Sequence, residues 1–280
     1  MVLFHAYREG NELHKNAWMH DDNDAMILLG VSFRHLMSDR TTLFSPELFD
    51  RYRDEFHDLL SAHNPVNFQR YGNVGASAAA ILDHVFPTSM RSISLHLSCS
   101  MAGCMSEVQA PVRASFPGVI VSVRTRSNKE LPMATYSSIQ TWLDAWLRDH
   151  CEHHYENALL VPHVSSSCPG SVFLHLFVTA PPPVLFFECG TQISHLVRPG
   201  PAITIPIQNG KAIFRLKGII YIGGFHYRVR LFSDSDVWHY DGRENYGNPL
   251  LEPDDSLTDL RGLSGSVVDV YVYALDEIVQ

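Results

Sequence analysis

A histidine and an aspartate near the C-terminal end of the chain have the spacing of a catalytic pair. His226 and Asp241 lie fifteen positions apart, and a hairpin turning near 233–236 would bring the start of one strand beside the end of the next. Hydrolases with a thiol nucleophile need an imidazole to take the proton from sulfur and a third polar group to orient that imidazole. The pattern predicts His226 as general base and Asp241 as its partner. A plain β-hairpin with a core tryptophan is the alternative interpretation.

A pair of glycines stands just before the histidine. Gly223 and Gly224 carry no side chain, so another chain can approach their backbone closely. We therefore expect this pair to border a channel for an extended substrate.

The residues around the pair have a recognisable order. The segment Phe214–Arg230 contains Gly-Gly-x-His-Tyr, and Val237–Gly242 contains Trp-His-Tyr-Asp. Together they resemble the histidine box of ubiquitin-specific proteases, a family of papain-like cysteine proteases. The resemblance implies a catalytic role for His226 and Asp241. It also implies substrate-binding roles for four neighbours, namely Gly223, Gly224, Tyr227 and Trp238.

Upstream segments follow the order of the same family. Residues 44–83 begin with a Ser-Pro helix start, and Pro183–Phe187 is similar to the family's Pro-x-x-Leu strand. The chain departs from the pattern at Asn73–Ser77, where the family usually carries a Gln-Asp pair. The resemblance covers roughly 25–275, and its specific part is the histidine box.

The family's nucleophilic cysteine is not found. It belongs to a Gly-x-x-Asn-x-Gly-Asn-Thr-Cys type segment, which would fall before Met1, and residues 1–24 contain no cysteine. Three explanations stay open: an incomplete gene product, a natural relative that lost the nucleophile, or another cysteine in its place. Cys99 and Cys189 follow strand-like runs without a helix N-terminus to lower the thiol pKa, so we interpret them as small buried residues.

The remaining candidates for chemistry are weak. Ubiquitin-specific proteases often carry a zinc ribbon of two Cys-x-x-Cys pairs. Structural zinc needs four closely spaced ligands, and the candidates here are Cys99, Cys104, Cys151 and Cys168. We expect no metal and no cofactor. Gly262–Ser266 superficially resembles a serine nucleophile motif, but its second glycine is misplaced, and we interpret it as a turn.

Hydrophobic spacing predicts the elements that must position these residues. Helical spacing covers 25–37, 45–60, 76–85 and 138–148. Ser45 is expected as the N-cap of the second helix, with Pro46 at its first position, and Ser137 with Gln140 as a capping box. Strands are expected at 93–97, 119–123, 172–178, 184–187, 203–207, 212–220, 226–232 and 267–273. Asn209 and Gly210 suit a hairpin turn.

Helices come first along the chain and strands last, which predicts an α+β fold with a mostly antiparallel sheet. Residues 1–24 are polar and end in an acidic run, so we expect them to be loosely ordered. Residues 25–280 are expected to form one domain, helical over 25–90 and β-rich over 91–280.

Composition limits the partners. The formal net charge is −9 and no cluster of Lys and Arg appears, whereas a phosphate-binding protein needs such clusters; we expect no nucleic acid. No apolar run is long enough to cross a bilayer, and no secretory signal is recognisable. The odd count of five cysteines favours reduced thiols in the cytoplasm or nucleus.

Two functions are consistent with the sequence. The resemblance implies a deubiquitinase-like domain that binds the C-terminal tail of ubiquitin or a ubiquitin-like protein and hydrolyses the (iso)peptide bond. The missing cysteine segment instead favours a non-catalytic binding or scaffold module of the same fold. A third interpretation is an unrelated α+β domain with a chance His-Tyr hairpin.

Overall fold

The computed structural model describes residues 1–19, 23–38, 46–71, 76–87, 90, 92–99, 101, 108–115, 123–124, 130–131, 136–158, 170, 172–189, 197–234, 236–245, 248–253 and 260–280. The helices within them are α1 (Val2–Glu9), α2 (Glu12–Ala17), α3 (Asp24–Ser38), α4 (Pro46–His63), α5 (Ala78–Val85) and α6 (Ile139–Ala158). The strands are β1 (Ser92–Cys99), β2 (Val108–Ser115), β3 (Val123–Arg124), β4 (Glu130–Leu131), β5 (Val172–Val178), β6 (Val184–Glu188), β7 (Ala202–Ile207), β8 (Gly210–Gly223), β9 (His226–Ser233), β10 (Asp236–Tyr240), β11 (Leu250–Leu251), β12 (Gly262–Leu263) and β13 (Ser266–Val279).

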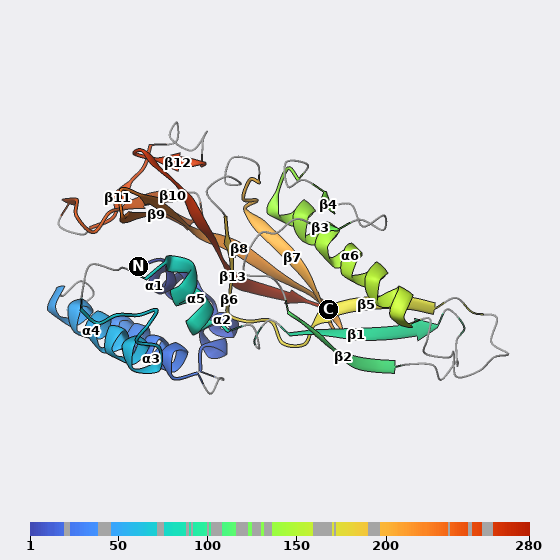
Figure 1. Cartoon of the computed structure of the whole chain (residues 1–280). Coiled ribbons are helices and arrows are strands. Elements are labelled where there is room, and N and C mark those ends of the chain that lie inside the picture. Colours follow the sequence, from blue (N-terminus) through green and yellow to red (C-terminus); the bar gives the residue numbers. More distant parts are fainter. Residues whose placement is uncertain are drawn as a thin grey trace.

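An 11-stranded sheet forms the centre of the molecule (Figure 1). Its main path runs β11-β10-β9-β8-β7-β5-β1-β2, and β13 joins β8 to β6 and β12. Every pair of strands described in this sheet is antiparallel except β5 with β7. The mixed architecture agrees with the predicted α+β class.

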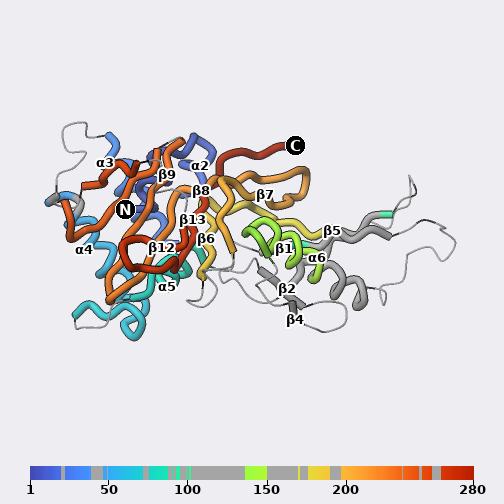
Figure 2. Tube along the Cα trace, turned by 90° about the horizontal axis from the view of Figure 1, so that it is seen from above, coloured from blue at the N-terminus to red at the C-terminus, as the bar shows by residue number. Residues whose placement is uncertain are grey.

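Two hydrophobic cores lie on opposite faces of the long strand β13. Val270 and Val272 pack into a core with α1, α3 and α5, whereas Tyr271 and Tyr273 pack into a second core under α6. Successive side chains of a strand point to opposite faces of a sheet, so this alternation lets one strand serve both cores. Figures 1 and 2 show α1–α5 gathered at one end and α6 at the other, and Figure 1 shows β1 and β2 at the same end as α6.

The predicted loose order of residues 1–24 is wrong over most of this range. α1 and α2 lie there, and Phe4, Tyr7 and Trp18 are buried. The Trp18 ring centroid lies 5.5 Å from that of Phe33 and 5.3 Å from that of Phe86. The few aromatic residues of this polar segment therefore anchor it through partners far along the chain.

His14 of α2 should make the protein sensitive to acid. Its side chain is fully buried, and its Nε2 accepts a hydrogen bond from Trp18 Nε1 at 3.0 Å. Burial lowers the pKa of His14 to about 4, whereas an unfolded chain has a histidine pKa near 6.5. As the pH falls, His14 is thus protonated at a higher pH in the unfolded state than in the folded state. We expect the free energy of unfolding to fall by roughly 3 kcal/mol between pH 6.5 and pH 4.

The control variant is His14→Gln, which keeps an acceptor for the Trp18 indole but does not titrate. Urea unfolding at a series of pH values should show a shallower acid slope for the variant. A residual slope is expected because burial also lowers the pKa of His5. Equal slopes for variant and wild type would show that His14 does not cause the acid sensitivity.

Most elements predicted from spacing are confirmed. α3, α4, α5 and α6 correspond to the four predicted helices, with starts that differ by one or two residues, and the strands predicted at 93–97 and from 172 onward are all present. The cap of α6 differs by one residue, because the Ser138 hydroxyl, rather than Ser137, accepts the Thr141 N–H at 3.2 Å. Ser45 and most of the predicted strand at 119–123 lie outside the described residues.

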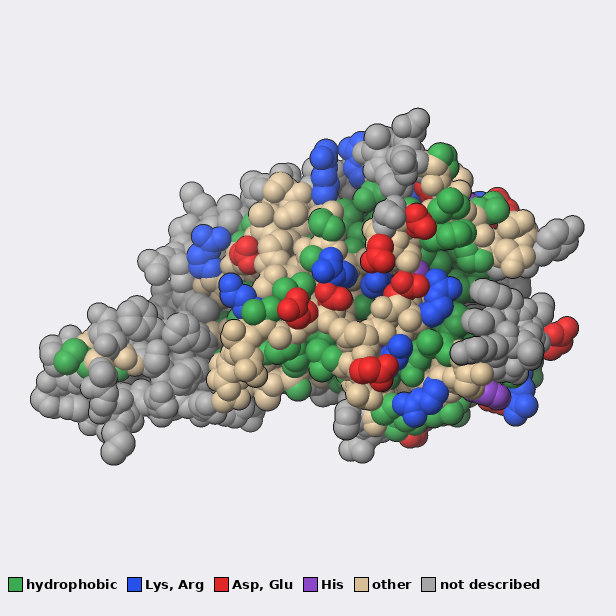
Figure 3. All heavy atoms as spheres, turned by 180° about the vertical axis from the view of Figure 1, so that it is seen from behind, with side chains coloured by type: hydrophobic (Ala, Val, Ile, Leu, Met, Phe, Trp, Pro, Cys, Tyr) green, Lys and Arg blue, Asp and Glu red, His purple; other side chains and the backbone are tan. Residues whose placement is uncertain are grey.

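The surface carries charges of both signs. On the face opposite to that in Figure 1, acidic and basic side chains of the described residues are interspersed (Figure 3). Among the helices that the structure describes, none combines the length and the apolar character that crossing a membrane requires.

Candidate active site

Two tight turns place the predicted site residues at one end of the sheet. The β8–β9 hairpin pairs Gly223 with His226 through a turn in which Gly224 and Phe225 both have φ of 57°. The β12–β13 hairpin turns at 264–265, and the same end of β13 pairs with β8 at Val267 and Ile222. β10 pairs with β9 up to Tyr240 and Val229, so Asp241 follows beside the start of β9.

His226 and Asp241 contact each other directly. The distance from His226 Nε2 to Asp241 Oδ1 is 2.6 Å, and their side chains are 16% and 1% exposed. The Nδ1 atom of the ring makes no hydrogen bond to the residues that the structure describes. The register of two antiparallel hairpins therefore brings the pair together as expected from the sequence, and the roles of the two residues stay predictions.

The carboxylate of Asp241 has two further partners. The Arg243 backbone N–H donates to Oδ1 at 2.8 Å, and Arg228 Nε lies 2.8 Å from Oδ2. Burial alone would raise the pKa of Asp241, but the Arg243 N–H, His226 and the Arg228 guanidinium together hold that pKa below its ordinary value. The carboxylate is therefore ionised at neutral pH.

An open cavity of about 390 Å³ adjoins the pair. Its lining comes from the ends of β8, β9 and β10 and from the β12–β13 turn: Gly223, Gly224, His226, Arg228, Asp241, Arg243, Glu244, Ser264, Gly265 and Ser266. A Cβ added at Gly224 or Gly265 would meet no atom within 4 Å. The two turns thus leave room for a second chain above their backbones.

Tyr227 and Trp238, the other predicted substrate-binding residues, do not line this cavity. The Tyr227 hydroxyl accepts the Ala78 N–H of α5 at 3.3 Å. Trp238 lines a separate cavity of about 270 Å³ with Met1 and Phe4. Strand alternation places both on the helix-covered face, so any contact with substrate would lie on that side of the sheet.

The two predicted channel glycines should respond differently to alanine. A Cβ at Gly223 would lie 2.9 Å from Ser266 Cα and 2.7 Å from its Oγ, so β13 must shift. We expect Gly223→Ala to lower the free energy of unfolding by about 1–3 kcal/mol, as overpacking does. In Gly224→Ala the only cost is the backbone strain of a φ of 57°, which should lower the free energy of unfolding by about 1 kcal/mol.

Urea unfolding of both variants measures this difference, with Gly224→Ala as the matched control. NMR of the His226 ring should show a larger change in Gly223→Ala, because that substitution displaces the wall of the cavity. A larger loss of stability in Gly224→Ala than in Gly223→Ala would contradict the packing seen between β8 and β13.

The cysteines do not supply a partner for His226 among the described residues. Cys189 is buried, and burial raises the pKa of its thiol, as the sequence interpretation expected. Cys99 lies on β1, which is separated from β9 by β8, β7 and β5. Cys104 and Cys168 lie outside the described residues, as does the side chain of Cys151, so the predicted zinc candidates stay untested as a set.

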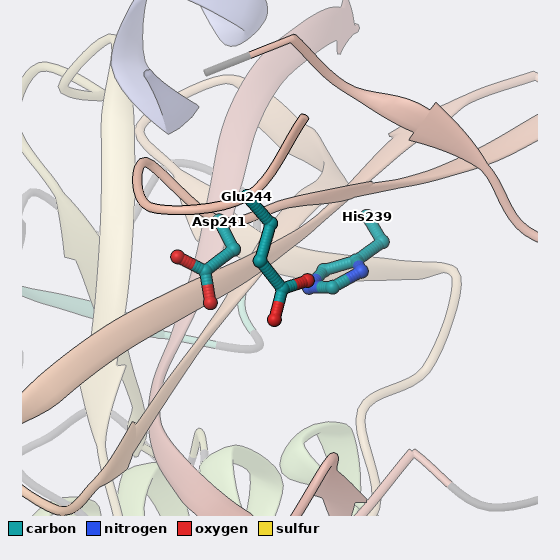
Figure 4. A group of neighbouring side chains, drawn as sticks. All are labelled: His239, Asp241 and Glu244. Carbon is teal, nitrogen blue, oxygen red and sulfur yellow. The ribbon is translucent and has the colours of Figure 1, made fainter. Parts of the chain in front are cut away.

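Three possible ligand atoms gather beside the pair. His239, Asp241 and Glu244 each offer one atom within 4.8 Å of the others, and Glu244 reaches toward the His239 ring from the turn after β10 (Figure 4). Asp241 already contacts His226, Arg228 and Arg243. A cation would have to displace or oppose the Arg228 guanidinium, so we assign no metal ligands here.

Sequence reasoning missed several residues of the cavity. Arg228 lies two positions after His226 on the same strand, so strand alternation could have placed it on the same face. Glu244 lies three positions after Asp241 and could have been expected near it. Ser264 to Ser266 carried only a turn signal. Their proximity depends on the pairing of β13 with β8, which the local sequence does not reveal.

Comparisons with known proteins identify no family for the chain. No protein-family model matches, and no curated protein matches.

Three solved structures of the SAGA DUB module resemble the chain at low identity. The Ubp8–Sgf11–Sus1–Sgf73 module bound to monoubiquitin has 11% identity and a TM-score of 0.35, covering 81% of this chain and 49% of that chain. A second structure of the module has 10% identity and a TM-score of 0.38, covering 96% and 61%. A yeast module with a mutant Sgf73 has 11% identity and a TM-score of 0.33, covering 89% and 54%. The chain thus spans 49–61% of the length of these chains.

Proposed function

We propose that this chain is a ubiquitin-specific-protease-like domain that receives the C-terminal tail of ubiquitin or a ubiquitin-like protein beside His226. The observation that carries the proposal is the 2.6 Å contact between His226 Nε2 and Asp241 Oδ1 at the edge of an open cavity. The pair stands within the segment whose residue order resembles the histidine box of that family.

The proposed chemistry is hydrolysis of the (iso)peptide bond by a thiol. Asp241 holds the Nε2 side of the imidazole, which leaves Nδ1 as the nitrogen that can take a proton from sulfur. The imidazolium then gives this proton to the leaving amine as the acyl group passes to sulfur, and a water molecule, deprotonated by the same imidazole, cleaves the resulting thioester and restores the thiol. The ionised Asp241 stabilises the positive charge that the ring carries while it holds the proton.

The tail of the partner is proposed to lie between the turns at 224–225 and 264–265. Both turns leave space above a glycine, which suits an extended chain with small residues at its end. The net charge of −9 suits a tail that carries arginines, as the tail of this family's substrate does. A cytoplasmic or nuclear location is part of the same proposal.

A non-catalytic binding module is the second candidate. It is supported by the cavity itself, which no cysteine of the described residues lines. In that case the domain would bind the same tail without cleaving the bond behind it.

The experiment that separates the two is reaction of the purified chain with ubiquitin whose C-terminus carries a thiol-reactive group. A covalent adduct, abolished by replacing one cysteine and by His226→Ala, would support the enzyme. Binding of unmodified ubiquitin without an adduct would support the binding module. Ubiquitin lacking its last two residues is the control, and equal binding with and without those residues would refute both forms of the proposal.

A further inference from the structure

Arg228 contacts both Asp241 of the predicted catalytic pair and Ser266 of β13. Its Nε lies 2.8 Å from Asp241 Oδ2, and its Nη1 donates to the Ser266 hydroxyl at 2.7 Å. Its side chain is 20% exposed, and Ser266 is buried at the start of β13. The guanidinium therefore bridges the end of β10 and the start of β13.

The two oxygens of Asp241 consequently face different partners, one of which is the permanently charged Arg228 and the other the imidazole of His226. Oδ1 receives His226 and the Arg243 N–H, whereas Oδ2 faces Arg228. The geometry of the Arg228 contact is that of an ion pair and not of a hydrogen bond, so rotation of the carboxylate away from the imidazole would also separate its Oδ2 from the positive charge of Arg228. An opposite charge this close also favours the ionised form of a carboxyl group.

We propose that Arg228 is a positioning residue that keeps Asp241 ionised and aimed at His226. The biological meaning of this role rests on the proposed function, whereas the titration that tests the role does not. The charged and titratable groups near Asp241 are His226, Arg228, His239, Tyr240, Arg243 and Glu244. Of these, Arg228 is the permanent cation whose side chain touches the carboxylate.

The proposal predicts how the Asp241 carboxyl group titrates. We would follow its ¹³C NMR resonance, assigned by its disappearance in Asp241→Asn, in wild type, Arg228→Gln and Arg228→Lys. In Arg228→Gln the midpoint of protonation should shift to higher pH, because the neighbouring positive charge is lost. Arg228→Lys keeps the positive charge, so its midpoint should lie close to that of the wild type.

Ser266→Ala is the matched control, since it removes the second partner of the guanidinium and leaves the charge in place. Its Asp241 midpoint should stay closer to wild type than that of Arg228→Gln. The same midpoint in wild type and Arg228→Gln would overturn the proposal, and so would a midpoint in Arg228→Lys equal to that in Arg228→Gln. If Arg228→Gln does not fold, Arg228→Met, which also removes the charge, takes its place, and a wild-type Asp241 midpoint in that variant would overturn the proposal.

The titration needs no ubiquitin, so the two proposals can fail separately. A shifted midpoint in a chain that does not bind ubiquitin would sustain the positioning role and refute the proposed function. An unshifted midpoint in a chain that reacts with the ubiquitin probe would do the reverse.

Discussion

Replacing Arg230 by leucine is expected to lower the free energy of unfolding by about 3–5 kcal/mol. Arg230 Nε lies 3.0 Å from both carboxylate oxygens of Glu252, and the two side chains are 5% and 9% exposed. The guanidinium also donates to the Tyr221 hydroxyl at 3.1 Å and to the Gly262 carbonyl at 3.2 Å. Removing it leaves the Glu252 carboxylate in a site with little water.

Urea unfolding of a double-mutant cycle measures this effect. The double variant Arg230→Leu with Glu252→Leu should recover much of the loss, because no charge is then left without its partner. The control is Arg53→Leu, whose ion pair with Asp50 is exposed and whose loss should cost within about 0.5 kcal/mol. Similar losses in Arg230→Leu and Arg53→Leu would contradict the buried network seen between β9 and the segment after β11.

Replacing Asp241 by alanine is expected to lower the free energy of unfolding by about 2–4 kcal/mol. The carboxylate side chain is 1% exposed. Its removal takes the hydrogen-bond acceptor from His226 and from the Arg243 N–H, and the ion-pair partner from Arg228. Arg228 then stays partly buried beside a neutral residue.

The sign of the accompanying pH dependence follows from the lowered pKa of Asp241. A carboxyl group with a lower pKa in the folded state contributes stability above its unfolded pKa, near 4, and this contribution is lost as pH falls further. Wild type should therefore lose stability below about pH 4 more steeply than Asp241→Ala. Urea unfolding at pH 7 and at acidic pH measures both effects.

Asp234→Asn is the matched control for this variant. Asp234 is an exposed residue of the β9–β10 turn with φ of 43°, a conformation that asparagine tolerates. Its stability and acid slope should be close to wild type. A comparable loss in the control, or an unchanged acid slope in Asp241→Ala, would show that the contacts of Asp241 do not hold in solution.

The sequence was sufficient to predict the hairpins that carry the pair. His226 opens one strand and Asp241 follows the next, and a short turn between two alternating strands leaves little freedom of register. The β7–β8 turn was predictable because Asn209 and Gly210 both tolerate positive φ, and Gly210 has φ of 150° in the structure.

The parts that could not be predicted depend on contacts between distant segments. Trp18 is buried by Phe33 and Phe86, so no local window shows why α1 and α2 are ordered. Ser266 reaches Arg228 through the pairing of β13 with β8, 38 positions along the chain. Tyr227 was grouped with its neighbour His226, but strand alternation turns the two side chains to opposite faces.

The proposed function requires a ubiquitin tail to enter the cavity beside His226. The most direct measurement is the NMR spectrum of the His226 ring during titration with ubiquitin, compared with ubiquitin that lacks its last two residues. Full-length ubiquitin should move the His226 resonances, while the truncated form should leave them nearly unchanged. No movement with full-length ubiquitin, or equal movement with both forms, would contradict entry of the tail into this cavity.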